Sequence, residues 1–223
     1  MKAHLRAGIA IFNAGGHHGA HDAWEEHWLE LDPDTDDEQF LHGLIQYTAA
    51  VFHATNRNWS GATGLAESGQ EYLAGLTDDY RDVNVDEVRS FLDVLERDPE
   101  VIERRQPVSL RHGGKELYPE DLGFEATAIA ATVLAEEREH HTEESHLARD
   151  ESELIERAIQ FARDDIESSG SAFPPLLFDY VREPADREII LQRLAEHVDL
   201  RVSREADVDG LFDPRESESD DGR

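Results

Sequence analysis

The 223-residue chain contains no cysteine, and only two of its basic residues, Lys2 and Lys115, are lysines. Without cysteine the chain has neither disulfides nor thiolate metal ligands, so nothing in it points to an oxidising compartment. No apolar run reaches the roughly 18–20 residues that span a bilayer, and the stretch 1–18 lacks an apolar segment followed by a cleavage site. We therefore expect no membrane partner, no signal peptide and a cytoplasmic location.

Positive charge is also scarce, because 21 Lys and Arg residues face 51 Asp and Glu residues, which gives a formal net charge of −30. Such a chain repels phosphate, so we expect no nucleic-acid partner. Hydrophobic residues still make up 39% of the chain, which is enough for a folded core. A core under an acidic, lysine-poor surface suits a cytosol at very high salt, where like-charge repulsion is screened. We interpret the chain as haloarchaeal-type, that is, halophilic; an ordinary acidic protein is the alternative.

Apolar residues recur at helical spacing along nearly the whole chain, which predicts an all-α fold. Residues 1–148 are expected to form a multi-helix, bundle-like domain. The polar stretch 140–150 predicts a boundary, and a smaller helical module is expected over 150–212. The tail 213–223 is acidic and serine-rich and is predicted to be disordered.

Local signals predict where several elements begin. Alternating residues around two glycines predict one small β-hairpin near 108–118. Thr35 followed by Glu38 is a capping-box pattern that predicts the start of a helix. Asn84 followed by Glu87 predicts a second capped helix start further along the chain.

Five short blocks in the first part of the chain carry its most specific pattern. They are Phe12-Asn13-Ala14-Gly15, His21-Asp22-x-x-Glu25-x-x-Trp28, Gly43-Leu44-Ile45-Gln46, His53 and Asn58-x-x-Gly61-Ala62. This pattern resembles the domain of unknown function 309 family over about residues 1–80. The resemblance implies a small all-helical fold and no known activity. Asp22 departs from the family pattern, which usually has glutamate there; the shorter carboxylate keeps the charge but changes its reach.

The same blocks place polar side chains on two helices that a short loop joins, so the helices are expected to pack antiparallel. His21 and Glu25 lie one turn apart on the first helix, and Gln46 and His53 lie two turns apart on the second. We expect these stripes to meet as one polar cluster, either a hydrogen-bond network or a binding site. The predicted cluster comprises His21, Asp22, Glu25, Gln46, His53 and Asn58.

Two functions from different classes follow from this cluster. The first is a non-catalytic module that binds a small molecule or a protein. The alternative is a metal-dependent hydrolase in which His21, Glu25 and His53 hold a divalent ion that activates water. Two histidines and one carboxylate with an open position suit zinc or iron. The pattern leaves open whether the protein is an enzyme and which oligomeric state it adopts.

Overall fold

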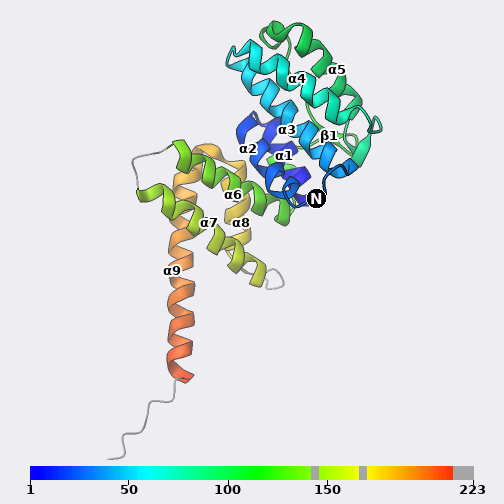
Figure 1. The fold of residues 1–223 in the computed structure, drawn as a ribbon. Coiled ribbons are helices and arrows are strands. Elements are labelled where there is room, and N and C mark those ends of the chain that lie inside the picture. Colours follow the sequence, from blue (N-terminus) through cyan, green and yellow to red (C-terminus); the bar gives the residue numbers. More distant parts are fainter. Residues whose placement is uncertain (142–145, 166–169, 213–223) are drawn as a thin grey trace, which may run out of the picture.

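The structure, a computed structural model, describes residues 1–141, 146–165 and 170–212, and over these it is mainly helical (Figure 1). The α-helices are α1 (Lys2–Asn13), α2 (His17–Trp28), α3 (Asp36–Thr55), α4 (Trp59–Leu73), α5 (Val85–Arg97), α6 (Phe124–His141), α7 (His146–Asp164), α8 (Phe173–Arg182) and α9 (Arg187–Phe212). The shorter elements are the 3₁₀ helices η1 (Tyr80–Asp82), η2 (Pro99–Glu103), η3 (Pro119–Asp121) and η4 (Pro184–Asp186) and the strands β1 (Arg111–His112) and β2 (Lys115–Glu116). The all-α prediction is confirmed.

The predicted hairpin is present, and it is anchored to the end of α1. β1 and β2 pair antiparallel, and Gly113 and Gly114 turn between them with φ of 63° and 76°, a region that glycine enters freely. The side chain of Asn13 fixes the hairpin. Its Nδ2 donates to the carbonyl oxygens of Leu110 and Leu117, and its Oδ1 accepts from the N–H of Leu110. The Asn13 amide is therefore a structural group rather than a free ligand.

The two predicted capping residues stand at helix starts, but one of them is used differently. Thr35 caps α3 and accepts a hydrogen bond from the N–H of Glu38. The Glu38 carboxylate accepts from Nε1 of Trp28 at 2.8 Å, which ties the end of α2 to the start of α3. Asn84 precedes α5, yet its side chain makes no capping hydrogen bond, and its Oδ1 accepts from the N–H of Arg111 instead. The Asn84 Nδ2 donates to the Glu87 carboxylate in the first turn of α5, so the Asn84 side chain joins the start of this helix to the hairpin strand instead of capping the helix.

Glycine allows two pairs of helices to approach closely. Gly8 of α1 faces Trp24 of α2, whose side chain is fully buried and donates from Nε1 to the carbonyl of Leu5. A Cβ atom at position 8 would lie only 2.1 Å from Trp24 Nε1. Gly43 lies in the same way against Leu73, so that α3 and α4 pack tightly. These contacts fix how α1 to α4 sit around one apolar core.

α6 packs against α1 and α2 and also against α7 and α8. Figure 1 shows α1–α5 gathered on one side of α6, with α9 extending away beyond α8. Part of the predicted boundary stretch 140–150 lies outside the described residues, as does the tail 213–223. The division into 1–148 and 150–212 therefore stays a prediction. In the described chain no helix has both the length and the apolar character needed to cross a bilayer.

Candidate functional site

α2 carries the candidate site, and a glycine turn sets where this helix begins. Gly15 has a φ of 93°, in the region that favours glycine, and Gly16 is the N-cap. From this start the helical repeat turns Trp24 into the core and leaves His21 and Glu25 on a half-exposed face. The local sequence therefore presents two predicted site residues together at the surface.

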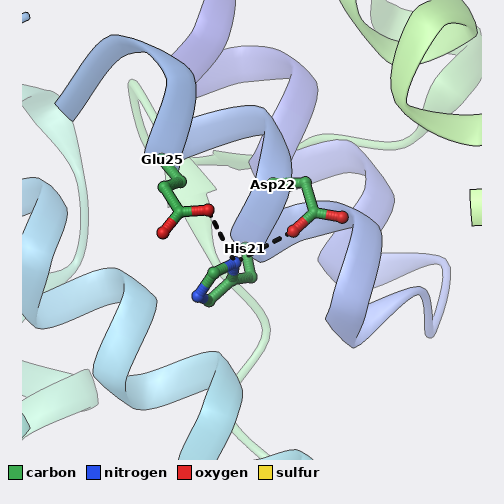
Figure 2. Close-up of side chains that lie close together, drawn as sticks. All are labelled: His21, Asp22 and Glu25. Atoms are coloured by element: carbon green, nitrogen blue, oxygen red, sulfur yellow. Dashed lines mark hydrogen bonds and ion pairs between the residues drawn. The ribbon is translucent and has the colours of Figure 1, made fainter. Parts of the chain in front are cut away.

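Two carboxylates of α2, those of Asp22 and Glu25, converge on one ring nitrogen of His21 (Figure 2). Nδ1 of His21 lies 3.0 Å from Oδ1 of Asp22 and 3.9 Å from Oε2 of Glu25. One potential ligand atom from each residue lies within 4.8 Å of the other two. Over the ranges that the structure describes, this is the one group of three or more His, Asp or Glu side chains with such spacing. The side chains are 32%, 29% and 44% exposed, so that solvent reaches the group.

The pKa values of the group reflect its hydrogen bonds. The bond to Asp22 is the main reason that the pKa of His21 is raised above its usual value, with burial opposing it and the Glu25 charge adding to it. Burial alone would raise the pKa of the Asp22 carboxyl, but the bonds and charges of His21 and His18 together hold that pKa below its usual range. Asp22 is therefore ionised at neutral pH, whereas His21 takes up a proton more readily than an isolated histidine.

His18 also belongs to this surface, and the sequence interpretation did not include it. Its Nδ1 donates to Oδ2 of Asp22 at 3.0 Å, so that the Asp22 carboxylate lies between two imidazoles. The signal was available, because His18 and Asp22 are four residues apart on one helix. The His18 side chain is 59% exposed, which places it at the outer edge of the group.

His53 and Asn58 form a second, separate polar group at the junction of α3 and α4. Nδ2 of Asn58 donates to Nδ1 of His53 at 2.7 Å, and Oδ1 of Asn58 accepts from the N–H of Gly61 as the N-cap of α4. A Cβ atom on Gly61 would lie 2.8 Å from Asn58 Nδ2 and 2.9 Å from His53 Nδ1. The Asn-x-x-Gly block is thus a helix cap with a histidine packed over its glycine.

Gln46 does not join either group through any hydrogen bond found in the described residues. Its Oε1 is buried without a hydrogen-bond partner there, and its Cβ faces Gly69 of α4. His42 on the same helix stacks on Tyr72 with ring centroids 3.7 Å apart, and its Nδ1 lies 3.4 Å from Oε1 of Glu38. The polar edge of α3 is therefore packed largely against α4.

The six residues of the predicted cluster are divided among three places: the group on α2, the junction of α3 and α4, and the buried position of Gln46. His21, Asp22 and Glu25 lie together, whereas the predicted ligand set of His21, Glu25 and His53 forms no such group among the described side chains. His53 lies in the last turn of α3, where Asn58 at the start of α4 donates a hydrogen bond to its ring. Asp22 occupies the third position of the group instead.

The His53→Ala variant is expected to lower the free energy of unfolding by only about 1 kcal/mol or less, since it removes one hydrogen bond of a half-buried ring. Asn58→Ala, the matched control, loses both that bond and the α4 cap and is expected to lose about 1–2 kcal/mol. Urea denaturation measures both values. A loss near 3 kcal/mol in His53→Ala would instead indicate that the histidine pairs a buried carboxylate.

Comparison with curated proteins finds no match to the chain. The family comparison agrees with the block pattern, since its match covers the glycine turn, α2, α3 and the Asn58 cap. Residues 5–65 match the model of the family described as Domain of unknown function (DUF309), which confirms the predicted resemblance for that segment.

Proposed function

We propose that the protein binds a divalent metal ion through His21, Asp22 and Glu25. The observation that carries this proposal is the convergence of one imidazole nitrogen and two carboxylate oxygens within 4.8 Å of one another. An ion at this position would replace the proton that His21 now shares with Asp22, and both carboxylates would compensate its charge. Metal-ion binding at these three residues is therefore the function that we propose for this helical protein.

The donor set indicates which ions fit. One imidazole with two carboxylates suits zinc, iron(II) or manganese(II), which accept mixed nitrogen and oxygen ligands. All three donors come from α2, and the side chains are between 29% and 44% exposed. Water would therefore complete the coordination sphere on the solvent side.

Hydrolysis is the second candidate function. It is favoured because the solvent side of the proposed metal site leaves room for a metal-bound water. A metal-bound water loses its proton more easily than free water and becomes a nucleophile near neutral pH. The ligands would be His21, Asp22 and Glu25, with His53 outside the set. A hydrolytic activity lost in Asp22→Asn and kept in His53→Ala would distinguish catalysis at this site from binding alone.

We also propose that the protein works in a cytosol at high salt. The net charge of −30 and the presence of only two lysines support this proposal. Under such conditions the acidic surface is screened, and metal binding depends on the local donors more than on long-range attraction.

Calorimetric titration with Zn²⁺ or Mn²⁺ tests the metal proposal on tag-free, chelator-treated protein. We expect one ion per chain, and we expect His21→Asn, Asp22→Asn and Glu25→Gln each to weaken binding by about tenfold or more. His53→Ala is the matched control and is expected to keep the wild-type affinity. Binding should weaken as pH falls through the raised pKa of His21, because the proton occupies Nδ1.

Two outcomes would contradict the proposal. The first is the absence of stoichiometric binding in the wild type. The second is a loss of affinity in His53→Ala equal to that in Asp22→Asn, which would restore the ligand set predicted from the sequence.

A further inference from the structure

A second place in the fold, which His17 of α2 lines one turn from His21, has the features of a small-molecule site. A cavity of about 540 Å³ lies between the turn from α1 to α2, the end of α3 and the segment 102–109, which comprises the end of η2 and the residues after it. Cavities of this size hold small organic ligands. Three apolar side chains contribute to its wall, namely Phe12, Ile102 and Pro107. One part of the wall thus suits an apolar group.

The rim of the cavity carries one charge of each sign. Among the described residues that line it, Arg57 is the cation and Glu103 is the carboxylate, and their charged ends lie 3.0 Å apart. The side chains are 74% and 44% exposed, so this ion pair is a weak one that a ligand can open. The backbone of Arg57 has a φ of 58°, which is uncommon for a residue other than glycine. Arg57 therefore places a cation at the mouth of the cavity, paired with Glu103.

The start of α2 adds a second electropositive element to the wall. Gly15 and His17 line the cavity, and Gly16 is an N-cap without a side-chain hydrogen bond to the helix. The first turn of α2 contains no acidic residue. The partial positive charge of a helix N-terminus is therefore left without a side-chain counterpart on α2. The N–H groups of Gly15 and His17 already donate to the carbonyls of Phe12 and Gly15, so this turn contributes only its partial positive charge and Arg57 supplies the hydrogen bonds to a ligand carboxylate.

His17 supplies a neutral polar group beside the apolar wall. Its ring meets Phe12 edge-on with centroids 5.3 Å apart, and burial lowers the pKa of the imidazole below its usual value. At neutral pH the ring is therefore uncharged and adds hydrogen-bonding capacity without repelling a cation. Gln106 and Ser109 provide further neutral polar groups along the segment opposite.

We infer that this cavity binds a small zwitterion with an apolar side chain, that is, a free aliphatic amino acid. Its carboxylate meets Arg57, its ammonium group meets Glu103, and its side chain covers Phe12 and Ile102. A zwitterion carries no net charge, so a protein with a net charge of −30 does not repel it as it would a simple anion. This inference does not depend on the metal proposal, because the two sites share no residue.

Calorimetric titration of the full chain with L-leucine in high salt tests the inference. We expect saturable binding of one molecule, weakened by about tenfold or more in Arg57→Gln and in Glu103→Gln, since each loses a charged hydrogen bond. N-acetyl-L-leucine lacks the ammonium group and L-leucinamide lacks the carboxylate, so both are expected to bind more weakly than leucine by a similar factor.

Arg97→Gln is the matched control. Arg97 is 73% exposed and pairs with Asp93 on α5, and it does not line the cavity, so its replacement should leave binding unchanged. Thermal melts confirm that each variant is folded. Absence of saturable leucine binding overturns the inference, and so does wild-type affinity in both cavity variants. Equal binding of N-acetyl-L-leucine also overturns it, because the cavity would then accept simple anions.

Discussion

Gly8→Ala is expected to lower the free energy of unfolding by about 3 kcal/mol or more, even though alanine is the better helix former. The added Cβ atom would lie 2.1 Å from Nε1 and 2.3 Å from Cε2 of Trp24. The indole is fully buried and hydrogen-bonded to Leu5, so it cannot move aside without disturbing the core. Relief therefore requires α1 and α2 to move apart, which exposes apolar surface along their contact. Urea denaturation followed by tryptophan fluorescence measures the loss.

The control for this prediction is Gly64→Ala in α4. Nothing lies within 4 Å of a Cβ atom built at position 64, so the substitution adds no clash. It should raise the free energy of unfolding by about 0.5–1 kcal/mol through helix propensity alone. Equal stability of the two variants would show that α1 and α2 do not need glycine at their crossing.

The thermal midpoint is expected to rise by at least about 10 °C between 0.1 M and 3 M KCl, equivalent to roughly 2.5–5 kcal/mol for a chain of this length. The net charge of −30 makes the folded state repel itself when ions are dilute. The Debye length falls from about 10 Å at 0.1 M to about 3 Å at 1 M, so that neighbouring carboxylates cease to act on one another. Melts followed by circular dichroism over this range measure the shift.

Removing surface charge separates screening from other effects of salt. Glu67, Glu71 and Glu100 are exposed, and replacing all three with glutamine removes three negative charges while leaving the core unchanged. This variant should melt above the wild type at 0.1 M KCl and approach it at 3 M. A wild-type midpoint that does not change with salt would contradict the halophilic interpretation.

Helix positions could be predicted from the sequence because they depend on local spacing and capping. Thr35 caps α3 as expected, since an N-cap side chain finds its partner within its own turn. Asn84 shows the limit of such reasoning. Its amide bonds the N–H of Arg111, 27 residues away, and a local pattern contains no information about a strand that arrives from elsewhere. The amide oxygen of Asn84 could accept from the N–H of Glu87 or from that of Arg111. Its tertiary contact with the hairpin strand determines that it accepts from Arg111.

The candidate site was predictable where its members share one helix. His21 and Glu25 face the same side of α2 because they are four residues apart, and the structure places them together. His53 lies on another helix, and a periodic pattern fixes the face of a helix but not the position along its axis opposite a neighbour. The spacing of His18 and Asp22 also places them on one face of α2, but the rotamer that turns the Asp22 carboxylate between His18 and His21 is not determined by spacing.

Asn13 joins parts of the chain that are distant in sequence, and this affects the order in which the protein can fold during synthesis. Its partners Leu110 and Leu117 are 97 and 104 residues further along. Both lie beyond residues 5–65, the segment that matches the family. Contacts that close loops of this length form late, because the chain entropy is lost before the contact is gained. On the ribosome, the helices of the family segment can therefore form early, while the Asn13 amide stays without these partners until the hairpin has emerged.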